Sequence, residues 1–256
     1  MSDVSFRLDG QVAVVTGGAS GIGLASARLF ASLGAAVCLM DRHADQAEVA
    51  AAELRASGAD ASASGMDISD EGQVADAFAT ALRRHGRIDA LVCNAGAGSN
   101  APAVEMGLEA WNAAIAVNLT GTFLCAREAA RHMIAAERGG AIVCTASIMG
   151  LSGGGFGNNV NYQASKGGVV NLVRGLAVEW ARHRIRVNAV APGWVRTPFI
   201  GWDKDPARLA RLADLVPLGR LAEAEEIAPA IVFLAGPGAA MITGHTLPVD
   251  GGFLAR

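Results

Sequence analysis

The stretch Thr16-Gly17-Gly18-Ala19-Ser20-Gly21-Ile22-Gly23 decides the fold that this sequence predicts. It joins a run of β-branched and apolar residues at 12–16 to an Ala-rich helical pattern at 22–33. Glycine permits a tight turn and lets the backbone approach an anion closely, and the helix that follows directs free N–H groups and its positive dipole end at that anion. We therefore expect a strand–turn–helix unit that binds the pyrophosphate of a dinucleotide. The residues expected to contact it are Gly17, Ser20, Gly21, Ile22 and Gly23.

Outward from this loop, short apolar runs alternate with helical patterns along the whole chain. The expected strands lie at 12–16, 36–40, 90–93, 141–145, 186–190 and 246–249, with a weaker strand that ends near 66–67, and the expected helices lie at 22–33, 46–57, 71–85, 108–136, 160–183 and 223–234. Strands that are apolar throughout indicate a parallel sheet with both faces covered. Right-handed crossovers then give a doubly wound, Rossmann-like α/β fold with seven parallel strands and helices on both faces.

No repeat or linker divides the 256 residues, so we expect one domain over residues 1–256. Residues 197–218 are irregular and rich in proline, which indicates a lid over the substrate. With a net charge of −3, no basic stripe and one tyrosine, the chain is not expected to bind nucleic acid. No apolar run reaches membrane-spanning length and no signal peptide is apparent, so we expect a cytoplasmic protein without membrane contact.

The four cysteines lie in apolar contexts without Cys-x-x-Cys spacing or a Cys/His cluster. We interpret Cys38, Cys93, Cys125 and Cys144 as buried, reduced residues and expect no metal site. A thiol nucleophile or thiol ligand is the alternative.

The second strand leads to Asp41, about twenty residues beyond the glycine loop. An acid there accepts hydrogen bonds from the adenosine ribose and repels a 2′-phosphate, which favours NAD over NADP. Two alternatives stay open: Arg42 would pair with a 2′-phosphate, and Asp41 would be only a solvated strand-end acid. Strand carboxyl ends also place further residues at this pocket, namely Asp67, Ile68, Asn94, Ala95 and Gly96.

Tyr162 and Lys166 are four residues apart on a predicted helix, which places them on one face. Ser147 follows the fifth strand and should reach the same edge of the sheet. A free phenol has a pKa of about 10, so we expect the ammonium of Lys166 to lower the pKa of Tyr162 and make it an acid/base. Ser147 would hydrogen-bond the substrate oxygen. Ser152 is a rival for that position, although it lies inside a glycine-rich loop.

In their order and separation these motifs resemble the short-chain dehydrogenase/reductase family. The resemblance spans the chain and rests on Thr16–Gly23, Asp67, Asn94–Gly96, Asn118, Ser147, Tyr162–Lys166, Pro192–Gly193 and residues 249–252. It implies that Ser147, Tyr162 and Lys166 are catalytic and that Asn118 holds a water linking Lys166 to solvent. It implies a homotetramer, and it assigns Tyr162 and Lys166 with four further residues to the cofactor: Pro192, Gly193, Val195 and Thr197.

One departure concerns the substrate side. Ser147 and Tyr162 are fifteen residues apart, about two more than the family's usual spacing, and the intervening residues 152–159 are rich in Gly and Asn. We expect an enlarged loop over the pocket, and the expected substrate residues are Gly98, Ser99, Ser147, Phe156, Asn158, Asn159, Tyr162, Trp194, Phe199 and Trp202. Trp194 and Trp202 would alternatively pack the lid onto the core.

The resemblance, together with Asp41, implies a NAD-dependent oxidoreductase that interconverts a secondary alcohol, such as a polyol or sugar, and its ketone. A 3-oxoacyl-thioester reductase is the alternative, although that reaction usually uses NADP. More remote alternatives are an epimerase or dehydratase and a non-catalytic dinucleotide-binding regulator. The Ala-rich helices at 108–136 and 160–183 carry surplus apolar surface, which favours pairing between copies of the chain.

Overall fold

The computed structural model describes residues 6–153, 157–199 and 205–256. A seven-stranded sheet forms its centre, and each neighbouring pair of strands is parallel. From one edge to the other its strands are β3 (Ala61–Gly65), β2 (Ala36–Asp41), β1 (Val12–Thr16), β4 (Ala90–Cys93), β5 (Gly140–Thr145), β6 (Ile185–Pro192) and β9 (Thr246–Val249). The order reverses between β1 and β4, which confirms the doubly wound fold.

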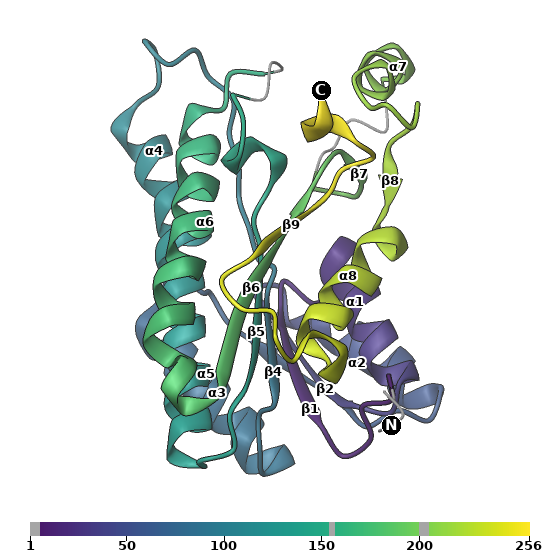
Figure 1. Ribbon diagram of the computed structural model, residues 1–256, viewed down its shortest axis with the longest axis vertical. Helices are drawn as coiled ribbons and strands as arrows, with labels where there is room; N and C mark the ends of the chain where they lie inside the picture. Colours follow the sequence, from purple (N-terminus) through teal and green to yellow (C-terminus); the bar gives the residue numbers. More distant parts are fainter. Residues whose placement is uncertain (1–5, 154–156, 200–204) are drawn as a thin grey trace.

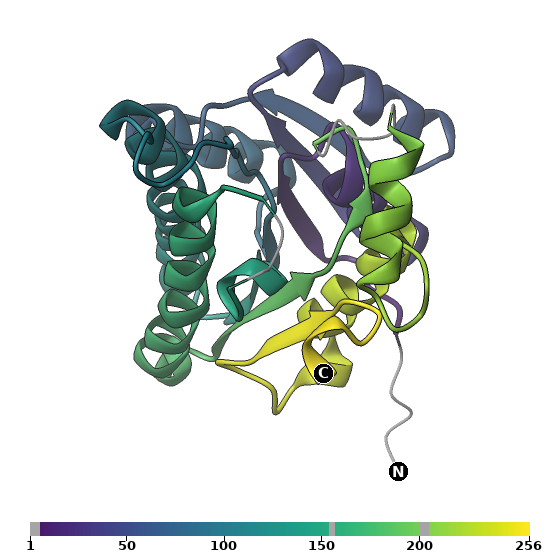
Figure 2. The ribbon, with the colours of Figure 1, turned by 90° about the horizontal axis from the view of Figure 1, so that it is seen from above.

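Helices cover both faces of the sheet, as the apolar strands predicted (Figure 1). One face carries α1 (Gly21–Ser32), α2 (Ala44–Ala56) and α8 (Ala224–Ala235). The other carries α3 (Glu71–His85), α4 (Leu108–Ile115), α5 (Thr122–Ala135) and α6 (Val160–Trp180). Figure 2, which looks onto the carboxyl edge of the sheet, shows the two groups on opposite sides. Each face therefore buries its own apolar cluster against the strands.

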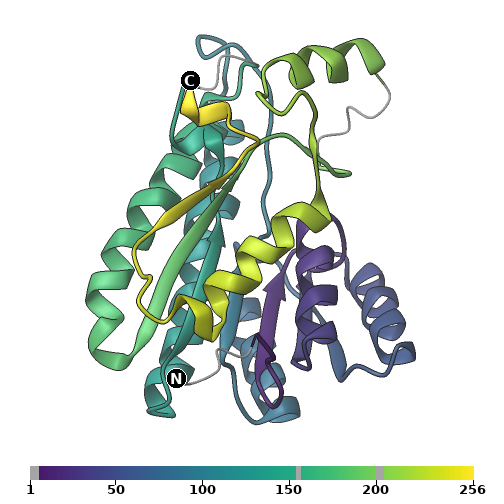
Figure 3. The same ribbon diagram turned by 45° about the vertical axis from the view of Figure 1, so that its right-hand side comes forward.

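The carboxyl edge carries a smaller structure of its own (Figure 3). Helix α7 (Pro206–Asp214) lies there with a two-stranded sheet of β7 (Val195–Arg196) and β8 (Ala222–Glu223). Leu212 of α7 is fully buried in a third apolar cluster with Ile148 and Trp194. The predicted irregular segment thus contains a helix whose apolar face rests on the edge where a ligand would bind.

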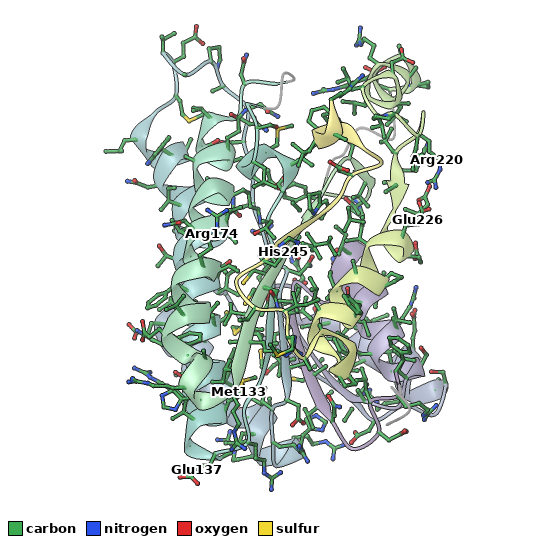
Figure 4. The ribbon with its side chains drawn as sticks, in the orientation of Figure 1. Met133, Glu137, Arg174, Arg220, Glu226 and His245 are labelled. Carbon is green, nitrogen blue, oxygen red and sulfur yellow. The ribbon has the colours of Figure 1, made fainter. Side chains whose placement is uncertain are left out.

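Arg220 and Glu226 fasten the end of this segment to α8, and Figure 4 shows them pointing toward one another. The two guanidinium nitrogens donate to the two carboxylate oxygens over 2.6 and 2.7 Å. The hydrogen bond from Arg220 lowers the pKa of Glu226 to about 2. Such a bidentate pair fixes direction as well as distance.

Besides shifts of one to three residues at other element ends, three features differ from the prediction. The expected single helix at 108–136 is interrupted by a π-helical segment, Ala116–Gly121, between α4 and α5. The third strand ends at Gly65 rather than near 66–67, because its register with β2 ends at Asp41. The small β7–β8 sheet was not predicted, since two-residue strands produce no periodicity.

All four cysteines are free and buried, as predicted. Within the described ranges no three acidic, histidine or cysteine side chains gather in a way that would suit a metal ion. Of the helices in those ranges, none has the length and apolarity needed to cross a membrane.

Candidate active site

Two adjoining cavities open at the carboxyl edge of the sheet, where strand order reverses. One, of about 170 Å³, is lined by the glycine loop, Asp41 and residues 94–96. The other, of about 200 Å³, is lined by Ser147, Trp194 and residues 98–100. Tyr162 and Thr197 line both cavities. A ligand in the first cavity would therefore meet a ligand in the second at Tyr162.

The glycine loop has no room for side chains toward its interior. Gly17 and Gly21 have φ angles of 61° and 50°, in the left-handed region. A Cβ on Gly23 would lie 2.1 Å from the carbonyl oxygen of Gly17, which also accepts from Asn94 Nδ2 over 3.1 Å. The first turn of α1 has no acidic residue, and the Ser20 side chain does not cap it. Its first N–H groups are thus left to bind an anion in the cavity that Gly21 and Ile22 line, so the loop fits a dinucleotide pyrophosphate.

We expect Gly23→Ala to weaken NADH binding at least about tenfold and to lower the melting temperature. The added methyl has to displace backbone at Gly17 and the Asn94 side chain. Fluorescence titration with NADH and thermal melting measure both effects. Gly107→Ala is the control, because a Cβ there meets nothing within 4 Å. Equal NADH affinities for the two variants would contradict the proposed position of the pyrophosphate.

Asp41 lies at the end of β2 and lines the first cavity. Its Oδ2 accepts from the backbone N–H of Ala19 over 3.2 Å and its Oδ1 from that of His43 over 3.0 Å. Arg42 is exposed, its Nε donates to His43 Nε2, and it lines neither cavity. The carboxylate therefore faces the cavity while the neighbouring cation does not.

The other predicted cofactor residues divide into two groups. Asn94, Ala95, Gly96 and Lys166 line the first cavity, Pro192, Gly193 and Val195 line the second, and Ile22 lines both. Asp67 and Ile68 follow β3 at the same edge but line neither cavity. The Asp67 carboxylate accepts from Ser69, and Ile68 is buried against Gly121. Their part in cofactor binding stays a prediction.

Tyr162, Lys166 and Ser147 lie together, as predicted. Lys166 Nζ is 5.6 Å from the centre of the Tyr162 ring and donates to the carbonyl oxygen of Thr145 over 2.6 Å. Ser147 follows β5 and hydrogen-bonds Tyr162. The rival, Ser152, donates to the carbonyl oxygen of Ile148 and lines neither cavity. Thr145, which holds Lys166, was not predicted, because it acts through its backbone carbonyl.

The electrostatics of this group differ from expectation. Burial raises the pKa of the Tyr162 phenol, and its hydrogen bond with Ser147 opposes that rise. Burial lowers the pKa of Lys166 to about 8. Burial of the phenol therefore outweighs any lowering of its pKa by Lys166, and the expected lowering is not found among these groups. Nζ of Lys166 donates to the Thr145 carbonyl and lies 5.6 Å from the centre of the Tyr162 ring.

Asn118 lies in the π-helical segment and is fully buried. Its Oδ1 accepts from the N–H of Ala97 over 2.7 Å, and its Nδ2 donates to the Ala97 carbonyl and to Ser165 Oγ over 2.8 and 2.9 Å. The wider π turn directs this side chain toward the loop after β4. A Cβ on Gly96 would lie 3.4 Å from Asn118 Oδ1 and 3.8 Å from Lys166 Nζ, so the two residues border the same small space.

The second cavity contains most of the predicted substrate residues. Gly98, Ser99, Ser147, Asn159, Tyr162, Trp194 and Phe199 line it. Asn158 does not: it is exposed, and its carbonyl accepts from the N–H of Ala101. Phe156 and Trp202 lie outside the described residues. Residues that sequence reasoning missed here are Asn100, Ile148, Met149 and Gly157.

Trp194 combines both of its predicted interpretations. It lines the cavity, and it also packs in the apolar cluster beneath α7. Its ring meets that of Phe253 edge-on, with 4.9 Å between centroids. The C-terminal residues thus support one wall of the cavity.

Comparisons with known proteins agree with this geometry. A family model described as Enoyl-(Acyl carrier protein) reductase matches residues 17–254. Cis-4-hydroxycyclohexanecarboxylate dehydrogenase of Sinomonas cyclohexanicum is 46% identical over 96% of this chain and 97% of its own. D-threitol dehydrogenase of Mycolicibacterium smegmatis is 42% identical over 99% of this chain and 96% of its own. The crystal structure of a gluconate 5-dehydrogenase from Burkholderia cenocepacia, in complex with NADP and tartrate, superposes with a TM-score of 0.93 at 36% identity, covering 98% of both chains.

Proposed function

The chain belongs to the short-chain dehydrogenase/reductase family, and from this premise we propose that it is a NAD-dependent dehydrogenase of a neutral, hydroxylated secondary alcohol. Its members oxidise alcohol CH–OH groups or reduce the corresponding carbonyl, and this chain is an oxidoreductase of that kind. One observation carries the proposal: Tyr162 and Ser147 present hydroxyl groups in a cavity that adjoins the dinucleotide cavity, and no charged side chain of the described residues lines it.

The residues have separate roles in the proposed reaction. When bound, nicotinamide supplies or accepts the hydride. Tyr162 gives a proton to, or takes one from, the substrate oxygen. Ser147 hydrogen-bonds the same oxygen and holds it at the phenol. Lys166, held by Thr145, keeps a cation behind the Tyr162 ring, and Asn118 borders the space next to it.

The substrate class follows from the lining of the second cavity. Ser99, Asn100 and Asn159 provide neutral hydrogen-bonding groups, and Ile148, Met149 and Phe199 provide apolar surface. Arg196 directly follows the lining residues Trp194 and Val195 in the sequence, but it does not line the cavity. It pairs with Glu223 at 3.3 Å instead. A hydroxylated, uncharged substrate matches such a lining, because a carboxylate would be desolvated there without a cationic partner.

A substrate panel tests the proposal. Threitol, butane-2,3-diol, cis-4-hydroxycyclohexanecarboxylate and acetoacetyl-coenzyme A are assayed by nicotinamide absorbance with NAD(H) and with NADP(H). We expect kcat/KM for a neutral diol or polyol to exceed that for the carboxylate at least about tenfold. Preferred reduction of the thioester would establish the 3-oxoacyl alternative. NADH binding without turnover of any alcohol or ketone would favour a regulatory protein.

Asp41 supports NAD over NADP, although the gluconate 5-dehydrogenase above holds NADP. Its carboxylate lines the dinucleotide cavity, and among the described lining residues the only cation is Lys166, which donates to the Thr145 carbonyl. We expect Asp41→Ser to raise kcat/KM for NADP at least about tenfold, because it removes a like charge from the 2′-phosphate. Asp45→Ser, an exposed acid in the first turn of α2, is the control. If the unmodified enzyme already prefers NADP, the role of Asp41 is wrong.

We further propose that the chain is one domain over residues 1–256, in which the segment 197–218 acts as a lid and α7 rests on the substrate cavity through Leu212.

We also propose a homotetramer, since α5 and α6 present an apolar groove with Phe123, Leu172 and Leu176, and Val178 is 83% exposed. Light scattering at micromolar concentration tests the assembly, and a monomer would exclude it. Four buried, free thiols suit the reducing cytoplasm that we propose as its location.

A further inference from the structure

Asn161, the residue before Tyr162, joins three separate elements with one buried side chain. It is fully buried near the start of α6. Its Nδ2 donates to Ser99 Oγ over 2.9 Å and to the carbonyl oxygen of Ala110 in α4 over 3.0 Å. Its Oδ1 accepts from the backbone N–H of Tyr162 over 2.8 Å. The N–H and carbonyl partners determine which amide atom is which, since a backbone N–H only donates and a carbonyl only accepts.

The bond to Tyr162 replaces a helix cap. The first N–H groups of a helix have no intrahelical partner. At α6 the N-cap residue, Asn159, makes no side-chain cap, and the first closed turn is the bond from Gln163 N to Asn159 O. The N–H of Tyr162 would therefore lose its hydrogen-bond partner if Asn161 were shortened. Asn161 thus fixes the backbone that carries the phenol, and with it the direction of the ring.

The bond to Ser99 affects the substrate cavity. Ser99 lines that cavity in the loop after β4, and its neighbour Gly98 would place a Cβ 3.7 Å from Tyr162 Cδ2. An amide NH₂ can only donate, so Asn161 occupies a lone pair of Ser99 Oγ and leaves the hydroxyl hydrogen to be donated into the cavity. The loop is held next to the ring of Tyr162, so that a hydroxyl donor and the phenol line the same cavity.

On the basis of the proposed function, we propose that Asn161 is a positioning residue which fixes Tyr162 and, through Ser99, selects substrates with a second oxygen next to the carbon that is oxidised. The helix α4 is the third point of attachment: Figure 1 shows it beside α6, and the bond from Asn161 to Ala110 joins the two. Vicinal diols and α-hydroxyketones carry the oxygen that Ser99 would recognise. Simple secondary alcohols lack it.

The test compares butane-2,3-diol with butan-2-ol, which differ only in that second oxygen. We expect Ser99→Ala to lower the ratio of kcat/KM for the diol to kcat/KM for the mono-alcohol about tenfold, the value of one hydrogen bond. We expect Asn161→Ala to lower this ratio similarly and also to lower kcat for both alcohols at least about tenfold, with NADH affinity retained. The double variant should show no further loss in the ratio, since both changes break one chain of contacts.

Asn188→Ala is the matched control. Asn188 is an equally buried asparagine in β6, and it likewise bridges segments, by donating to the Ile242 carbonyl and accepting from the His245 N–H (His245 is labelled in Figure 4). It lines neither cavity, so it should change thermal stability without changing the diol ratio. If Asn161→Ala does not fold, the ratio in Ser99→Ala decides alone.

An unchanged ratio in Ser99→Ala, or the same ratio in Asn161→Ala as in Asn188→Ala, would overturn the inference while the proposed function stands. Turnover of threitol but of neither butane alcohol by the unmodified enzyme would overturn the inference alone. NADH binding without turnover of any alcohol or ketone would overturn the proposed function, and the inference with it.

Discussion

Tyr162→Phe is expected to lower kcat about 10³-fold, and to leave the dissociation constant for NADH within about twofold. The substitution removes one oxygen, and general acid–base catalysis by a positioned side chain contributes about 10²–10⁴-fold. The ring contacts persist, because Phe199 and Lys166 lie 6.1 and 5.6 Å from the ring centroid. Steady-state kinetics and fluorescence titration separate the two effects. Since the chain has a single tyrosine, no second phenol can substitute for it.

The serine that hydrogen-bonds Tyr162 supplies the matched pair of variants for this experiment. Ser147→Ala removes the hydroxyl beside the phenol, whereas Ser152→Ala removes one that lies outside the cavity. Ser147→Ala should lower kcat, as Tyr162→Phe does, and Ser152→Ala should leave kcat unchanged. Turnover that survives in Tyr162→Phe would show that another group transfers the proton, and the proposed mechanism would be wrong.

Lys166→Met is expected to lower kcat at least about 10²-fold, because the cation behind the Tyr162 ring is lost. At the same time it is expected to raise the melting temperature at pH 7. The pKa of Lys166 falls from 10.5 to about 8 through burial, so the folded state favours the neutral amine. The ammonium form therefore opposes folding below pH 8, by about 3 kcal/mol. This cost diminishes as the pH rises from about 8 to 10.5. Methionine has a similar length and carries no charge, so it relieves the cost.

Part of that gain is offset, because the hydrogen bond to the Thr145 carbonyl is lost, at about 1 kcal/mol. A net rise of several degrees is expected for a chain of this size. Melting curves at pH 7 and pH 9.5 measure it, and the advantage of the variant should shrink at the higher pH. Arg174→Met removes an exposed cation from the same helix (Figure 4). It should neither lower kcat nor raise the melting temperature. A melting temperature that falls in Lys166→Met at both pH values would contradict the cost of the buried charge.

Local patterns were sufficient for the fold. The glycine loop predicted its strand and helix, and strands β1, β4 and β9 and helix α3 have the predicted bounds. These elements are determined by apolar periodicity and by glycine geometry, and both depend only on residues that are close together in the sequence. The long pattern at 108–136 concealed the π-helical turn at Asn118, because a single inserted residue hardly changes the apolar spacing.

The sequence by itself determined that Tyr162 and Lys166 share one face of a helix and that Asp41 and Ser147 end strands of a single sheet, since both statements follow from the spacing of residues along regular elements. Only the tertiary structure decided what each polar group faces. Lys166 donates to the Thr145 carbonyl, Arg196 pairs with Glu223, and Asn161 joins α4 and the loop at Ser99 to Tyr162. Burial and hydrogen-bond partners arise where distant segments meet, and no pattern within one element encodes them.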